Sequence, residues 1–174
     1  LLYLGYDLNT TDEAQLREAQ QLLVDAKKRG VYQSFVMDEI FGKMEGGNAA
    51  IGAYYAGDFL SMQENNEDLA FVIPDEGSNW FVDAMCIPAC CENKYEAELF
   101  INFLCRPDIA GGNMDWVCYS TPISAAKEFL PEEVVSDPVA YPDEEILQNG
   151  VSFAFLPPEI SRYVESLFME VRNS

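Results

Sequence analysis

The order of helix-like and strand-like segments predicts an α/β layered fold for this chain of 174 residues. Segments with the helical spacing of apolar residues alternate with short apolar runs of strand length, and Gly, Pro, Asn and Asp separate them. The hydrophobic fraction of 49% is that of a globular protein and excludes a disordered chain. The longest apolar runs, such as Ala49–Ala56, have the length of a strand and are too short for a membrane-spanning helix.

The N-terminal part of the chain predicts two helices. The first runs from about Asp12 to Arg29, and Gly30 ends it. Thr10 is expected to form a capping box with Glu13 at its start. Its apolar face consists of residues at helical spacing, namely Leu16, Ala19, Leu23 and Ala26. A shorter helix is expected at Asp38–Glu45, before Gly46 and Gly47.

The middle of the chain predicts three strands and one helix. Apolar runs at Ala49–Tyr55, Leu69–Pro74 and Trp80–Ile87 are typical of strands. A helix is expected to begin at Gly57-Asp58 and to end at about Glu64. Further helices are expected in the remaining part of the chain, namely Lys94–Leu104, a segment that starts at Pro107, Pro131–Val135, Asp143–Gln148 and Glu159–Arg172.

Charge and residue types exclude several classes of function. Thirty acidic and ten basic residues give a formal charge of −20, so no basic surface is available for a nucleic acid. The acidity is consistent with simple solubility and also with attraction of a cationic ligand. The sequence contains no histidine, which excludes Ser-His and Cys-His nucleophiles. Hydrolase chemistry of those two kinds is therefore not expected.

The five cysteines do not form a metal-binding pattern. They are Cys86, Cys90, Cys91, Cys105 and Cys118, and no two of them have the spacing C-x-x-C. We expect buried or inert thiols, no metal site and no cofactor.

Several motifs follow one another along the chain in an order that resembles a known family. They are Asn9–Asp12, Lys43–Gly47 followed by Ala49–Gly52, Pro74–Trp80 leading into Asp83–Met85, Ile101–Leu104 with Arg106–Ala110, Tyr119–Pro122, and Tyr141–Asp143. In this order they resemble the spermidine/putrescine-binding proteins of ATP-binding-cassette transporters, which are type II periplasmic binding proteins. The resemblance covers almost the whole chain, but only the second half of a family member.

This resemblance implies an incomplete type II periplasmic-binding-protein-like lobe with a segment that belongs to the second lobe. Residues 1–82 and 121–174 would form the C-terminal lobe, and residues 83–120 would cross into the N-terminal lobe. The opening Leu1–Leu4 is typical of the end of a helix, so we also expect the chain to be a fragment.

The resemblance also implies ligand-binding residues. Asp83 matches the family carboxylate that receives an ammonium group, although a strand-end aspartate is also common in turns. The family has a tryptophan two residues before this aspartate, where this chain has Phe81. Trp80 precedes it, and strand alternation predicts that only one of the two rings, Phe81, faces the ligand.

Three further side chains are candidates for the same site. Tyr55 occupies a position where the family often has tryptophan, and Tyr119 matches a family tyrosine in the cleft. Both residues are equally consistent with core packing. Asp38 is a candidate from the hinge side, but it can also be a plain helix N-cap, and Asp58 is interpreted in the same way.

The resemblance implies a binding protein, and not an enzyme, that captures a polyamine, spermidine or putrescine, for import. Its partners would be the polyamine and the permease subunits of a transporter. It would be extracellular or periplasmic and held at the membrane by a lipoprotein anchor or fusion outside this chain. Two alternatives are a protein of the same fold that binds another organic cation or a metal complex, and an α/β interaction domain without a role in transport.

Overall fold

The computed structural model describes residues 1–174, which form two compact units. Unit 1 comprises Leu1–Ile40, Val72–Phe81 and Gln148–Ser174. Unit 2 comprises Phe41–Phe71 and Val82–Leu147. One boundary between the units falls between Phe81 and Val82, next to the residue at which the sequence predicts a crossing. The assignment of residues 1–82, 83–120 and 121–174 to lobes stays a prediction.

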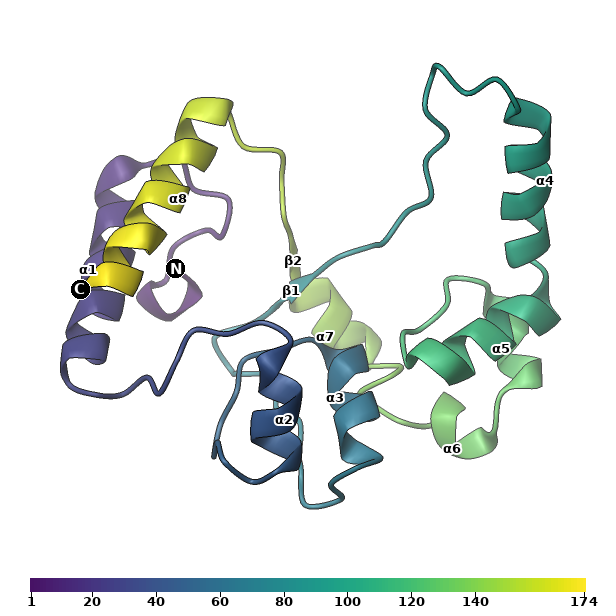
Figure 1. Cartoon of the computed structure of the whole chain (residues 1–174), viewed down its shortest axis with the longest axis horizontal. Coiled ribbons are helices and arrows are strands. Elements are labelled where there is room, and N and C mark those ends of the chain that lie inside the picture. The colour runs from purple at the N-terminus through teal and green to yellow at the C-terminus, as the bar shows by residue number, and fades with distance from the viewer. The chain divides into compact units, whose positions relative to one another are not determined.

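Unit 1 is built on two long helices, α1 (Glu13–Lys28) and α8 (Pro158–Asn173), which lie side by side (Figure 1). Leu16 and Val24 of α1 are buried, as are Leu167 and Val171 of α8. The unit also contains the short 3-10 helix η1 (Leu2–Leu4) and a two-stranded parallel sheet. The strands are β1 (Asn79–Trp80) and β2 (Val151–Ser152), with Asn79 opposite Val151.

Polar contacts hold the two helices of unit 1 in register. Arg17 Nη1 lies 2.8 Å from Glu170 Oε2, and Gln20 Nε2 donates to the same oxygen at 2.9 Å. Lys27 Nζ donates to the main-chain carbonyls of Val171 at 3.1 Å and Arg172 at 2.6 Å. Carbonyls in the last turn of a helix have no partner within the helix, so this ammonium caps α8.

The predicted helices are confirmed, and one predicted cap is wrong. The N-cap of α1 is Asp12, whose carboxylate accepts from the backbone N–H groups of Ala14 and Gln15. Thr10 instead accepts from the backbone N–H of Asp12 and donates to the Gln15 side chain. The carboxylate of Asp12 stands one residue before the helix, where its negative charge also complements the helix dipole.

The predicted strands are wrong except at one residue. Segments 49–55 and 69–74 form no strand, and the segment predicted at 80–87 pairs only at Trp80. A strand requires a hydrogen-bonded neighbour, and apolar composition alone does not supply one. Residues 51–55 and 70–74 therefore stay outside any regular element.

Unit 2 is mostly helical. It contains α3 (Ala56–Gln63), α4 (Lys94–Leu104), α5 (Pro107–Val117), the 3-10 helix η2 (Ser124–Phe129) and α6 (Glu132–Val135). Most of α2 (Glu39–Glu45) and α7 (Glu144–Asn149) also belong to it. Phe59 of α3 packs on Phe71, with ring centroids 5.2 Å apart, and Asn66 Nδ2 donates to the carbonyls of Met44 and Glu45 at the end of α2.

The segment after α5 is held at several points in unit 2. η2 packs closely on α5, where Ala110, Gly111 and Met114 are buried. The Tyr141 hydroxyl donates to the sulfur of Met114 at 3.0 Å, and Lys127 Nζ lies 3.9 Å from the centre of the Tyr141 ring. Ser120 donates to the carbonyl of Ala140. These contacts fix the chain on both sides of Tyr119.

All five cysteines are free thiols; Cys86, Cys90 and Cys105 are exposed, so of the two expected alternatives, buried or inert, burial does not apply to these three. Burial raises the pKa of the half-buried Cys118 thiol, and the charges of Glu64 and Asp115 raise it further. That thiol therefore stays protonated at neutral pH. No helix combines the length and the apolar composition that crossing a bilayer requires.

Candidate ligand-binding site

The side chain of Tyr119 lies directly on the first turn of α3. α3 begins after Tyr55, which has extended backbone angles, and Gly57 is the second residue of the helix. A Cβ atom at Gly57 would lie 2.4 Å from Cδ2 and 2.5 Å from Cε2 of the Tyr119 ring. The ring therefore occupies the space that any other residue at position 57 would fill with its side chain.

Asp58, the next residue of α3, lies near the hydroxyl of Tyr119. Its carboxylate raises the pKa of the phenol, and its backbone N–H lowers it. Burial raises the pKa of Tyr119 most, followed by the charge of Asp58, the hydrogen bond to its carboxylate and the charge of Asp83. Both carboxylates thus act on one phenol.

Tyr55 adds an exposed aromatic surface at the start of the same helix. It is 43% exposed, and its ring lies 5.1 Å from that of Tyr54 at an angle of 53°. The Tyr54 ring in turn meets Phe41 edge to face at 6.1 Å. We call Tyr55, Asp58, Asp83 and Tyr119 the tyrosine–aspartate cluster.

The structure brings three of the predicted site residues into one unit. Tyr55, Asp83 and Tyr119 all belong to unit 2, and Asp83 and Tyr55 are exposed. Trp80, Phe81 and Asp38 belong to unit 1, where all three are exposed, Trp80 at 43% and Phe81 at 44%. β1 ends at Trp80, so the prediction that Phe81 rather than Trp80 faces the ligand stays a prediction.

Of the two interpretations of Asp58 from the sequence, a site residue and a helix N-cap, the N-cap is wrong. Tyr55 precedes the helix, and Asp58 stands at its third position. The spacing of Tyr55 and Asp58 was the available signal, because residues three apart at a helix start lie on one face. The contact with Tyr119 joins segments 61 residues apart in the chain, and no local pattern predicts it.

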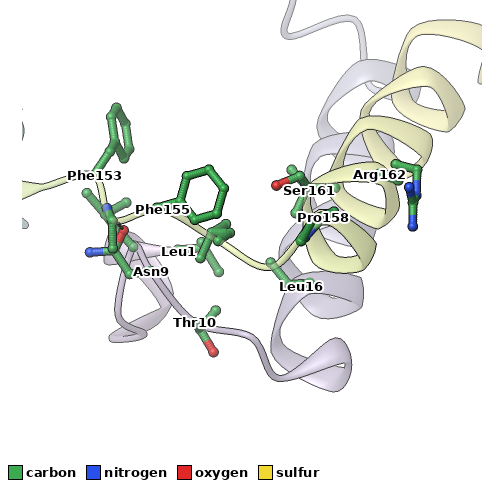
Figure 2. A pocket seen from close by; sticks show the side chains of 13 residues that line it. Leu1, Asn9, Thr10, Leu16, Phe153, Phe155, Pro158, Ser161 and Arg162 are labelled. Carbon is green, nitrogen blue, oxygen red and sulfur yellow. Dashed lines mark hydrogen bonds between the residues drawn. The ribbon is translucent and has the colours of Figure 1, made fainter. Parts of the chain in front are cut away.

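A cavity of about 720 Å³ in unit 1 has different chemistry (Figure 2). Its lining is mainly apolar, with Leu1, Leu16 and Phe155 among the residues around it. Asn9 uses its side chain to bind the backbone of Ser152 and Ala154, and Thr10 binds Gln15. The lining includes Arg162 and no carboxylate, so this cavity does not suit a cation.

The chemistry of the tyrosine–aspartate cluster suits an organic cation. Carboxylates attract an ammonium group and accept its hydrogen bonds, and aromatic faces attract it through their quadrupole. The same aromatic faces pack against methylene groups. No group of three or more His, Cys, Asp or Glu side chains lies close enough together to hold a metal ion.

Comparisons with known proteins agree with this chemistry. Residues 1–149 match the sequence model of a family described as bacterial extracellular solute-binding protein. The chain is 33% identical over 147 residues to the spermidine/putrescine-binding periplasmic protein of Escherichia coli, covering 84% of this chain and 42% of that protein. It is 27% identical over 179 residues to the putrescine-binding periplasmic protein SpuD of Pseudomonas aeruginosa, covering 99% and 48%.

A solved structure gives the same result. The spermidine/putrescine ABC transporter substrate-binding protein PotD of Streptococcus pneumoniae matches with a TM-score of 0.85 and 36% identity, over 99% of this chain and 53% of that one. The predicted fold class, part of a type II periplasmic binding protein, is confirmed. The chain spans about half the length of these relatives. It belongs to the family of bacterial extracellular solute-binding proteins.

Proposed function

We propose that this chain forms part of a binding protein that captures a polyamine, spermidine or putrescine, for an ATP-binding-cassette importer. The observation that carries the proposal is the tyrosine–aspartate cluster, in which Asp58 and Asp83 both act on the phenol of Tyr119. The names of the relatives, which specify putrescine or spermidine, support the ligand class.

Asp83 is proposed as the main carboxylate for a ligand ammonium, since Asp58 is half-buried beside Tyr119. Asp83 is exposed, and an ion pair in water at 4 Å is worth only about 1 kcal/mol. The same pair at an effective dielectric constant of 20 is worth about 4 kcal/mol. Tight binding therefore needs a second surface that excludes water from Asp83, as closure of two lobes provides.

The predicted lobe boundaries, the other predicted site residues and the predicted location are part of the same proposal. Residues 83–120 would cross into the N-terminal lobe, while residues 1–82 and 121–174 would form the C-terminal lobe. Trp80, Phe81 and Asp38 would line the ligand from that lobe. The binding protein would be extracellular or periplasmic, held at the membrane by an anchor outside these residues, and would deliver the polyamine to the permease subunits of the transporter. A solute-binding role, rather than catalysis, agrees with the family.

Isothermal titration calorimetry tests the proposal on the longest natural polypeptide that contains residues 1–174. We expect putrescine or spermidine to bind with micromolar or tighter affinity. Asp83→Asn is expected to weaken binding about 30-fold or more, because removing one partner of an enclosed charge pair leaves the other unpaired.

The control is Glu132→Gln, which removes an exposed carboxylate in the first turn of α6 and should change the affinity less than about threefold. Equal, small losses for the two variants would refute the role of Asp83. If another organic cation gives heat of binding and no polyamine does, the proposed ligand is refuted, but the proposal of a cation-binding site stands.

A further inference from the structure

We propose that Gly57 is a positioning residue: its missing side chain lets the Tyr119 ring rest on the first turn of α3, within reach of Asp58. The binding consequence rests on the proposed function of the tyrosine–aspartate cluster. The positioning itself is independent of any ligand.

The backbone does not explain a glycine at this position. Four glycines have positive φ angles, namely Gly5, Gly30, Gly47 and Gly77, and Gly57 is not among them. Gly57 lies inside a helix, where glycine is about 1 kcal/mol less favourable than alanine. A residue with a Cβ atom would therefore suit the local conformation better.

The space around Gly57 does explain it. Carbon atoms pack best at about 3.5–4.0 Å, whereas a Cβ at position 57 would lie 2.4, 2.5 and 2.7 Å from three atoms of the Tyr119 ring. The ring would have to move by about 1 Å to restore ordinary contact. Two other helical glycines are different: a Cβ at Gly42 in α2 or Gly112 in α5 would meet nothing within 4 Å.

The ring cannot move by this amount and keep its contacts. Asp58, which follows Gly57 in the same turn, lies close enough to the Tyr119 hydroxyl to change the pKa of the phenol. Ser120, the residue after Tyr119, is tied to the carbonyl of Ala140. The ring thus lies against Gly57 and near Asp58, two successive residues of α3. A binding group held to within about 0.5 Å requires this kind of support.

The experiment compares Gly57→Ala, Tyr119→Ala, the double variant Gly57→Ala/Tyr119→Ala and the control Gly42→Ala. Three quantities are measured in each protein: the free energy of unfolding in urea, the NMR resonance of tyrosine labelled with ¹³C at Cζ, and the affinity for putrescine. Tyr119→Ala identifies the resonance of Tyr119. Gly42→Ala places the same methyl group in another helix, where there is room for it.

We expect Gly57→Ala to destabilise the protein, to move the Tyr119 resonance toward that of an exposed tyrosine, and to weaken putrescine binding about tenfold. In the Tyr119→Ala background the same substitution should stabilise the helix and change the affinity less than twofold. If Gly57→Ala alone fails to fold, recovery of folding in the double variant supports the proposal.

The proposal is overturned if Gly57→Ala leaves the Tyr119 resonance in place. It is also overturned if the substitution costs the same stability with and without the Tyr119 ring, including a failure to fold in both backgrounds. A protein that binds neither putrescine nor spermidine refutes the proposed function instead. The Tyr119 resonance and the stabilities of the four variants still report the position of Tyr119 in that case.

Discussion

Gly111 and Gly112 are neighbours in α5, and the structure predicts opposite effects when each is replaced by alanine. A Cβ at Gly112 would meet nothing within 4 Å, so Gly112→Ala adds only helix propensity. We expect it to stabilise the protein by about 0.5–1 kcal/mol. A Cβ at Gly111 would lie 3.1 Å from Cβ of Phe129 and 3.3 Å from the carbonyl oxygen of Ala126, both in η2.

The crowded atoms at Gly111 belong to the backbone and the Cβ of η2, so no flexible side-chain tip can move aside. Overpacking of this kind costs about 1–3 kcal/mol, which equals or exceeds the gain in helix propensity. Gly111→Ala is therefore expected to be about 1–3 kcal/mol less stable than Gly112→Ala. Urea unfolding of the two variants, followed by circular dichroism, measures the difference.

The stability difference between these two variants also bears on the proposed site, because α5 and η2 flank the segment that carries Tyr119. Movement of η2 away from α5 is expected to move Tyr119 with it. Equal stabilisation by the two alanine substitutions would show that η2 does not approach α5 as closely as described. The packing argument for the position of Tyr119 would then lose its support.

Two further predictions concern single contacts. Lys27→Met is expected to cost about 1 kcal/mol in urea unfolding, because Lys27 caps the carbonyls of Val171 and Arg172, whereas Lys28→Met at an exposed neighbouring position should be close to neutral. The pKa of Tyr119 is higher in the folded protein than in the unfolded chain. The neutral phenol therefore stabilises the folded state fully below about pH 10, and this stabilisation is lost as the pH rises above about 10. Stability should therefore fall above pH 10 less steeply in Tyr119→Phe than in the parent protein, and identical slopes would contradict the assigned environment.

The sequence predicts the helices well and the strands poorly, for a physical reason. Helix signals are local: the apolar residues at 97, 101 and 104 and the Pro at 107 suffice to locate α4 and the start of α5. A strand depends on a neighbour that is distant in the chain, as Asn79 depends on Val151. Composition at 49–55 and 69–74 indicates apolar segments but says nothing about pairing.

The same distinction separates the site residues that were predicted from the one that was missed. Asp83, Tyr55 and Tyr119 were selected through a resemblance to a family, which carries three-dimensional information that spacing lacks. Asp58 was assigned from its local position alone, as a cap. Its partner Tyr119 is distant in sequence, and only the structure shows the contact.

Two residues next to Tyr119, Gly57 in space and Cys118 in the chain, are unfavourable for their own backbone conformation. They support the proposed assignment of Tyr119 to a binding site. Gly57 weakens the first turn of α3, and Cys118 is the one non-glycine residue with a positive φ angle, 59°, at the end of α5. A non-glycine residue in this conformation costs about 1 kcal/mol or more. Glycine at 118 and alanine at 57 would each satisfy the local backbone better. Local conflicts of this kind concentrate at functional sites, where the position of one side chain matters more than local stability. Here the two conflicts, from helices far apart in the chain, meet at the ring whose pKa responds to both Asp58 and Asp83.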